Sequence, residues 1–202
     1  MAKKEYNEWI HSQCSEANCS GKPRVLLIGD SICNGYQPVV RAKLWGTCFV
    51  DYLSTSYTLD SKMFEALVYG LVKDSNYDLI HINQGLHGIH LTKTTYKSNY
   101  KKLINKLTEK YGAKLVLATT TPAYKEGNKL NHPDWTKRVK VRNIALGELA
   151  HEFNLPVNDL FAVAKSLKIT DRAQDGVHYE QSGYEVLGTA VVDMIKKQLN
   201  LN

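Results

Sequence analysis

Residues 24–31 read Arg-Val-Leu-Leu-Ile-Gly-Asp-Ser, an apolar run that ends in a glycine and two small polar residues. An uninterrupted run of this length is typical of a strand covered on both faces, as in a parallel sheet. A turn and a helical pattern follow over residues 31–44, so the run starts a strand–helix unit. Ser31 therefore stands where the strand gives way to the helix.

The same alternation of strand and helix continues outward to the end of the chain. The expected strands are 24–28, 48–52, 79–83, 114–119 and 156–158, and the expected helices are 31–44, 61–72, 96–111, 139–153, a helix from 160, and 181–199. Repeated alternation predicts a parallel sheet between layers of helices, in one three-layer α/β/α domain. Ligands bind such folds beyond the carboxyl ends of the strands, so residues after strand ends are the candidates for chemistry.

The composition fits one domain of this kind. The 202 residues are 43% hydrophobic and 23% charged, which allows one substantial core and does not indicate disorder. We expect residues 1–22 to form an extension packed on the domain, with a short helix in its first 20 residues, and residues 23–202 to form the domain itself. No apolar run approaches the roughly 18 residues that a membrane span needs, so no membrane contact is expected.

The formal net charge of +6 raises the question of nucleic acid. Much of the excess lies at helical spacing around an apolar stripe. The lysines concerned are Lys93, Lys97, Lys101, Lys102, Lys106, Lys110 and Lys114. This pattern is typical of a solvated helix face, and no groove-reading motif accompanies it, so no nucleic-acid partner is expected.

The four cysteines, Cys14, Cys19, Cys33 and Cys48, lack the spacing of zinc ligands. Free thiols in a cytoplasmic protein need the fewest assumptions, although Cys14 and Cys19 could pair if the chain were exported. The polar N-terminus shows no apolar segment of a signal peptide. We therefore predict a cytoplasmic protein and leave export open. The sequence indicates no oligomeric state.

Two segments far apart in the sequence carry residue types that suit nucleophilic catalysis. The hydroxyl of Ser31 can face the cleft, and its N–H, at a helix N-terminus, can point at a developing oxyanion. Residues 175–179 read Asp-Gly-Val-His-Tyr, where His178 could accept the serine proton and Asp175 could orient the imidazole. Each segment alone is also explained by helix capping, with Asp30 or Ser31 as the cap at the first. Their combination in an α/β domain is far rarer than either part.

This combination resembles the SGNH (GDSL-like) hydrolases over about residues 24–195. The resemblance implies a flavodoxin-like fold with sheet order 2-1-3-4-5, counted over the expected strands. It also implies hydrolysis of carboxylic esters without a metal or an organic cofactor. By position, Ser31 is the nucleophile, His178 the general base and acid, and Asp175 the orienting carboxylate. The same match makes Asp30 a structural partner.

The chain departs from the family pattern in two blocks. The third block of the family usually reads Gly-x-Asn-Asp, with the asparagine amide donating to the oxyanion, but residues 85–88 here read Gly-Leu-His-Gly. A neutral His87 could donate an N–H instead, and Asn83 is the other candidate. Residues 54–59, after the second strand, contain no glycine, so a side chain would crowd any N–H donor there. Residues 81–87 also resemble a sialate or carbohydrate O-acetylesterase-like subgroup, in which a histidine at this point is usual.

We therefore expect an esterase that removes small acyl groups, acetyl above all, from a small carbohydrate-like ester. Thr120 ends the fourth strand on the cleft side, and Tyr36 lies on the first helix. Both are candidates for substrate contact, with packing as the competing explanation for each. His87 and His90 are three positions apart, but no nearby ligand completes a metal site, so no metal is expected.

Three other functions remain open from the sequence. A thioesterase or lysophospholipase could use the same three residues. A sugar-binding protein could keep the fold with an impaired oxyanion hole, as the block without glycine and the replaced asparagine would allow. A nucleotide-binding domain would need Gly-x-Gly-x-x-Gly, and residues 29–31 do not provide that spacing.

Overall fold

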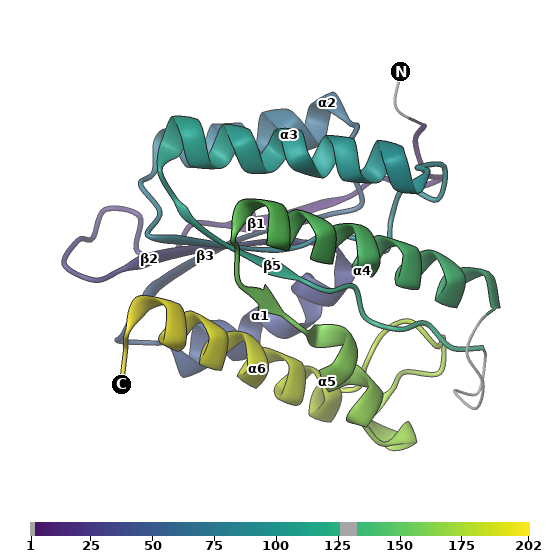
Figure 1. The fold of residues 1–202 in the computed structure, drawn as a ribbon. Helices are drawn as coiled ribbons and strands as arrows, with labels where there is room; N and C mark the ends of the chain where they lie inside the picture. Colours follow the sequence, from purple (N-terminus) through teal and green to yellow (C-terminus); the bar gives the residue numbers. More distant parts are fainter. Residues whose placement is uncertain (1–2, 126–132) are drawn as a thin grey trace.

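A six-stranded sheet forms the middle layer of the molecule (Figure 1). The structure is a computed structural model that describes residues 3–125 and 133–202. The strands are β1 (Ile10–Gln13), β2 (Arg24–Gly29), β3 (Phe49–Thr55), β4 (Leu79–Asn83), β5 (Lys114–Ala118) and β6 (Val157–Asn158). Strands β2 to β6 are parallel and lie in the order β3-β2-β4-β5-β6, which confirms the order expected for the five strands.

Strand β1 is the one element of the sheet that the sequence did not predict. It pairs antiparallel with β3 at the edge of the sheet, so the short helix expected near the N-terminus is wrong. All four of its side chains are exposed. The preceding carbonyl, of Trp9, accepts hydrogen bonds from the Thr55 hydroxyl at 2.7 Å and from the Ser56 N–H at 3.3 Å. Strand β1 therefore joins the sheet by backbone pairing and buries none of its own side chains.

Helices cover both faces of the sheet. They are α1 (Ser31–Lys43), α2 (Lys62–Asp74), α3 (Lys93–Tyr111), α4 (Pro133–Phe153), α5 (Leu160–Ser166) and α6 (Gln181–Leu199), with a short 3₁₀ helix η1 (Ile169–Asp171). Helices α1, α5 and α6 lie on one face, and α2, α3 and α4 lie on the other (Figure 1). Val25 and Leu27 of β2 pack into the first layer, and Leu26 and Ile28 pack into the second. The continuous apolar run of β2 is thus explained by burial on both faces.

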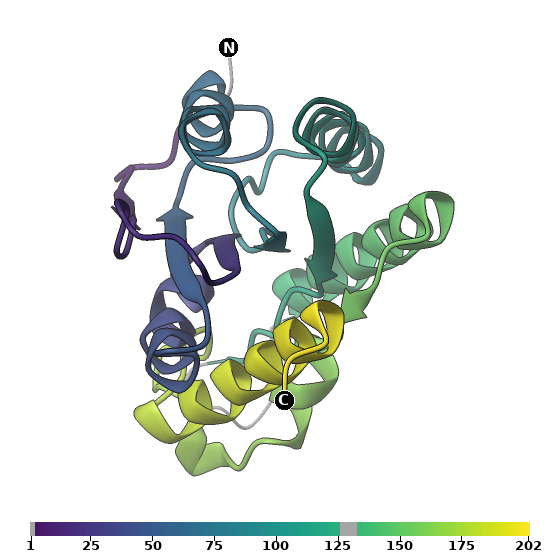
Figure 2. The ribbon, with the colours of Figure 1, turned by 90° about the vertical axis from the view of Figure 1, so that its left-hand side faces the viewer.

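Close packing of α1 against α6 positions the candidate site (Figure 2). A Cβ atom at Gly35 of α1 would lie 2.1 Å from the ring of Tyr184 in α6, so only glycine allows this approach. The two helices begin at Ser31 and Gln181. Their contact therefore sets the start of α1 against the loop that leads into α6.

The lysines of α3 form ion pairs with neighbouring helices. Lys93 and Lys97 both reach Glu148 of α4, at 2.6 and 2.7 Å, and Lys106 reaches Glu65 of α2 at 3.1 Å. These side chains are partly exposed, so each pair contributes little to stability, on the order of 0–1 kcal/mol. In the described ranges, none of the helices is both long enough and apolar enough to span a membrane.

Candidate active site

The start of α1 and the loop before α6 bring Ser31 and His178 together across 147 positions of sequence. The Nε2 atom of His178 lies 2.8 Å from Oγ of Ser31, and its Nδ1 lies 2.6 Å from Oδ2 of Asp175. A neutral imidazole that donates Nδ1–H to the carboxylate keeps a lone pair on Nε2, which can accept the serine proton. The arrangement has the geometry of a nucleophile, a base and an orienting carboxylate.

The loop that carries Asp175 and His178 is held from within and from outside. The Oδ1 atom of Asp175 accepts the backbone N–H of Val177 at 2.8 Å and that of His178 at 2.9 Å. Gly176 has a φ of +77°, and a Cβ there would lie 2.3 Å from the carbonyl oxygen of Tyr124. Tyr124 donates its N–H to the carbonyl of Gly176 at 2.7 Å. The glycine therefore allows both the turn and the contact that anchors it.

The environment of Asp175 favours its charged form. Partial burial would raise its pKa, but hydrogen bonds from the His178 ring and from two backbone N–H groups outweigh that effect, so the pKa lies below its ordinary value of 3.8. The carboxylate therefore stays ionised at neutral pH. It can orient the imidazole of His178 and stabilise the imidazolium that forms when the ring accepts a proton.

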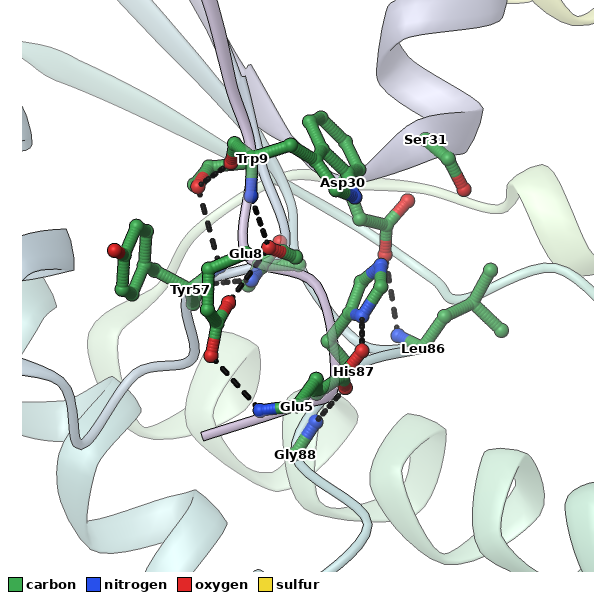
Figure 3. Close-up of polar contacts among 12 residues, drawn as sticks. Glu5, Glu8, Trp9, Asp30, Ser31, Tyr57, Leu86, His87 and Gly88 are labelled. Atoms are coloured by element: carbon green, nitrogen blue, oxygen red, sulfur yellow. Dashed lines mark hydrogen bonds and ion pairs between the residues drawn. The ribbon is translucent and has the colours of Figure 1, made fainter. Parts of the chain in front are cut away.

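Asp30 links the nucleophile's helix to the loop of residues 85–88. Its side chain is buried, and Oδ1 caps α1 by accepting the N–H of Ile32 at 3.0 Å. Its Oδ2 atom accepts the N–H of Leu86 at 3.1 Å (Figure 3) and that of Gly85 at 3.4 Å. Asp30 thus fixes the two segments relative to one another and has a structural role.

Arg142 of α4 holds the same loop from beneath, and the sequence reasoning missed it. The residue is 1% exposed, and its guanidinium donates to the carbonyls of Gly85, His87 and Gly88, the second at 2.7 Å. The ring of Tyr96 lies against its other face, 5.1 Å from Cζ to the ring centroid. Arg142 lies on the apolar face of α4, three positions after the buried Val139 and four positions before the buried Leu146. This spacing could have predicted from the sequence that the arginine is buried.

The N-terminal segment supplies one wall of the pocket at Ser31. The Nδ1 atom of His87 lies 2.8 Å from Oε2 of Glu5, and the other carboxylate oxygen accepts the N–H of Gly88 at 3.4 Å (Figure 3). The ring of Trp9 meets that of His87 edge-on, with centroids 6.0 Å apart. A pocket of about 330 Å³ is lined by Trp9, His11, Ser31, Asn34, His87 and His178. His87 therefore faces the same space as the candidate nucleophile and base.

The other candidate oxyanion donors are engaged elsewhere. Asn83 is buried, and its Nδ2 donates to the carbonyl of Thr119 at 3.2 Å, so the structure does not bring this side chain to the pocket. In the block without glycine, the N–H of Ser56 donates to Trp9, and that of Tyr57 donates to the Thr55 hydroxyl at 3.1 Å. The N–H of Ser31 and the side chain of His87 remain as candidates from the sequence.

The structure does not place the two substrate contacts expected from the sequence, Tyr36 and Thr120, at this pocket. Tyr36 is fully buried on the inner face of α1, with its ring edge-on to His81 at 6.3 Å between centroids. Thr120 is also buried, and its backbone N–H and carbonyl both bond to the side-chain amide of Asn143, at 2.8 and 3.0 Å. Neither residue lines the pocket. Trp9, His11 and Asn34 occupy its wall instead.

His87 and His90 belong to two separate pairs. His87 contacts Glu5, whereas Nε2 of His90 lies 2.9 Å from Oδ2 of Asp60. Over residues 3–125 and 133–202, no three His, Cys, Asp or Glu side chains gather so that they could hold a metal ion. These two histidines therefore give no support to a metal site.

Several solved structures resemble this fold along nearly the whole chain. A lipase/acylhydrolase from Enterococcus faecalis is 23% identical, with a TM-score of 0.68, over 87% of this chain and 96% of its own. A carbohydrate acetylesterase family member from Sinorhizobium meliloti is 17% identical, with a TM-score of 0.69, over 89% of this chain and 100% of its own. A GDSL-like lipase from Bacteroides thetaiotaomicron is 16% identical, with a TM-score of 0.68, over 91% and 95%.

Neither a protein-family model nor a curated protein matches the sequence. At these identities the structural likeness concerns the fold. It agrees with the sheet order and with helices on both faces of the sheet. The chain has the fold of the SGNH and GDSL-like hydrolases.

Proposed function

We propose that this protein is a serine esterase in which Ser31 is the nucleophile, His178 the general base and acid, and Asp175 the orienting carboxylate. One observation carries the proposal. The two ring nitrogens of His178 contact Ser31 and Asp175 at 2.8 and 2.6 Å, and this junction opens into a pocket. Serine is a weak nucleophile until an adjacent base removes its proton, and this geometry supplies that base.

In the first half of the reaction, Oγ of Ser31 attacks the ester carbonyl carbon while its proton passes to Nε2 of His178. The carbonyl oxygen becomes an oxyanion, and we assign its stabilisation to the N–H of Ser31 and the side chain of His87, two residues that line the pocket. The carbon–oxygen bond to the alcohol then breaks, and the alkoxide takes the proton from His178. Ser31 is left acylated, and the alcohol departs.

In the second half, water replaces the alcohol. It attacks the acyl carbon and gives one proton to Nε2 of His178. The bond between the acyl carbon and Oγ of Ser31 breaks, and the serine oxygen takes that proton back. The products are a carboxylic acid and an alcohol, and no cofactor enters the balance.

We further propose a small acyl group, acetyl above all, on a hydroxylated alcohol such as a sugar. The pocket holds about 330 Å³, and its described lining offers one large apolar side chain, Trp9, among polar groups. An indole face can stack on a sugar ring, while Asn34 can hydrogen-bond hydroxyl groups. The Sinorhizobium meliloti neighbour, described as a carbohydrate acetylesterase family member, supports the same substrate class.

We propose a cytoplasmic location as well. All four cysteines are free, and Cys14 and Cys19, which could have paired in an exported protein, do not form a disulfide. Disulfides are rare where glutathione and thioredoxin keep thiols reduced. Cell fractionation, with detection of the tagged protein in each fraction, tests this location. Recovery of the protein outside the cytoplasmic fraction would contradict it.

Hydrolysis of p-nitrophenyl acetate tests the esterase proposal. We expect steady turnover that Ser31→Ala and His178→Ala each abolish. Two matched controls are available. Ser61 lies at the N-terminus of a helix, as Ser31 does, and His90 pairs with an aspartate, as His178 does, but neither Ser61 nor His90 lines the pocket. Ser61→Ala and His90→Ala should retain activity, whereas turnover that survives Ser31→Ala would contradict the proposal.

An ester panel then tests the substrate class. Acetylated mono- and disaccharides should be hydrolysed with a higher kcat/KM than p-nitrophenyl decanoate, because the described pocket wall provides no apolar channel for a long chain. A preference for the decanoate ester would assign the same three residues to a lipase-like substrate instead.

A further inference from the structure

Glu5 and His87 repeat the geometry of Asp175 and His178 at the same pocket. In each pair a carboxylate oxygen lies close to Nδ1 of the imidazole, at 2.8 Å for Glu5 and 2.6 Å for Asp175. Both rings line the pocket together with Ser31. In the view of Figure 3, Glu5 lies on one side of the His87 ring, and Asp30 and Ser31 lie on the other. The site therefore holds two imidazoles, each with its own carboxylate.

The contact with Glu5 decides what His87 can donate. A neutral imidazole has one N–H, and an ionised carboxylate is only an acceptor, so neutral His87 must place that hydrogen on Nδ1. Its Nε2 atom then carries a lone pair, which repels an oxyanion. The expectation that neutral His87 serves as the oxyanion donor therefore conflicts with this contact. Only the imidazolium can bond to Glu5 and still donate Nε2–H to the pocket.

The charges around His87 come from several elements. Glu5 from the N-terminal segment and the buried Asp30 at the start of α1 favour the imidazolium. Arg142 of α4, beneath the loop carbonyls, opposes it, as do His178 and His11 across the pocket when they are protonated. Glu5 is the group in direct contact with the ring, and the His87 side chain is only 18% exposed. Glu5 is therefore the charged group that most directly favours the imidazolium form of His87.

We propose that His87 stabilises the oxyanion as an imidazolium, through Nε2–H, and that Glu5 is the positioning residue that holds both the orientation and the charge of this ring. The inference rests on the proposed esterase function and deepens it. Catalysis then needs opposite states of two histidines at one pH, with His178 neutral to accept a proton and His87 protonated to donate a hydrogen bond. The N-terminal segment is part of the catalytic apparatus because it brings Glu5.

The kcat/KM profile against pH follows from these two requirements. It rises on the acid side, because His178 must be neutral to accept the serine proton, and falls on the alkaline side, because His87 must be protonated to donate Nε2–H. A neutral donor in place of His87 would leave only the acid limb. The alkaline limb is therefore the signature of the proposed role.

The test measures kcat and KM against pH with p-nitrophenyl acetate for the full chain and three variants. His87→Asn carries an amide N–H at every pH, so its profile should lose the alkaline limb and keep the acid limb. Glu5→Gln keeps an acceptor but loses the charge, so kcat should fall about tenfold with KM little changed, and the alkaline limb should begin at lower pH. Glu8→Gln is the matched control. Glu8 accepts hydrogen bonds from the Ser56 hydroxyl at 2.6 Å and from the N–H of Glu5 at 2.9 Å, both of which a glutamine can replace, and it does not contact His87. Its profile should keep the wild-type shape.

Nitrogen-15 NMR of the histidine rings provides a second readout, which reports the protonation state of His87 in the unchanged protein. At the pH of the kcat/KM maximum, His87 should show two protonated ring nitrogens. A neutral ring, with its hydrogen on either nitrogen, would overturn the proposal, as would an alkaline limb that persists in His87→Asn. Failure of the esterase function looks different, since hydrolysis would then be absent or would survive Ser31→Ala.

Discussion

Exchange of Asp175 for asparagine separates two contributions of its carboxylate. One oxygen accepts the N–H groups of Val177 and His178 and thereby holds the turn, and the other accepts Nδ1–H of the His178 ring. In Asp175→Asn the amide oxygen can keep the turn, but then its NH₂ group faces Nδ1. The ring is forced to carry its hydrogen on Nε2 and can no longer accept the proton of Ser31.

The hydrogen bonds of the turn set the magnitude. To restore the productive ring, the amide must flip and give up two backbone hydrogen bonds, at about 1 kcal/mol each. The flipped amide still lacks the negative charge beside the imidazolium, which costs about 2 kcal/mol more for a bond to a charged group. The bond to the charged group is counted at about 2 rather than 3 kcal/mol, because the Asp175 side chain is 51% exposed and solvent screens its charge. The sum of about 4 kcal/mol corresponds to about a 10³-fold loss of kcat.

Steady-state hydrolysis of p-nitrophenyl acetate, combined with urea unfolding, measures this effect. We expect kcat to fall about 10³-fold, while the free energy of unfolding changes by less than about 1 kcal/mol, because the turn survives. Asp171→Asn is the matched control, since Asp171 bonds to Ser182 and to the N–H of Lys168 and does not touch His178. Asp175→Asn activity within tenfold of the wild type would refute the reasoning, since the carboxylate would then not determine the state of the ring.

Three further expectations concern the supports of the site. Gly176→Ala should lower the free energy of unfolding by at least about 2 kcal/mol and impair turnover, because of its positive φ and the approach of the Tyr124 carbonyl; a variant of unchanged stability in urea would contradict this. Arg142→Met should lower the free energy of unfolding by at least about 3 kcal/mol, because three buried carbonyls lose their donor. It should also lower kcat, because the loop that positions His87 loses its support; urea unfolding and kinetics measure the two effects. Burial lowers the pKa of His81 to about 3, so the unfolded chain binds a proton that the folded chain does not, and stability should fall as the pH drops from about 6.5 toward 3. His81→Gln should flatten that loss between pH 7 and pH 5, and an unchanged slope would show that another group causes it.

The parts of the fold that the sequence predicts are those in which burial leaves a pattern. The run at Arg24–Gly29 is apolar on both faces because helices cover both, and the helix expected at 181–199 begins and ends as expected. Strand β1 left no such pattern. Its side chains are all exposed and it pairs with β3 through hydrogen bonds rather than apolar burial, so hydrophobic periodicity could not reveal it.

The same distinction applies to the site. Asp175 and His178 lie in one short turn, and Ser31 follows a strand end, so local sequence indicates their arrangement. Glu5 meets His87 across 82 positions through an irregular segment, and no local pattern encodes such a contact. The burial of Tyr36 could have been predicted from the sequence, because this residue lies four positions after Ile32 on the apolar face of α1, which is the spacing of a core residue.

A fluorophosphonate probe tests the nucleophile directly, because it labels serines that an adjacent base has activated. Mass spectrometry of the digested protein then locates the labelled residue. We expect a single adduct, on Ser31, that is absent in Ser31→Ala and forms far more slowly in His178→Ala. An adduct on another serine, or none in protein that still hydrolyses p-nitrophenyl acetate, would contradict the assignment of Ser31 and the mechanism built on it.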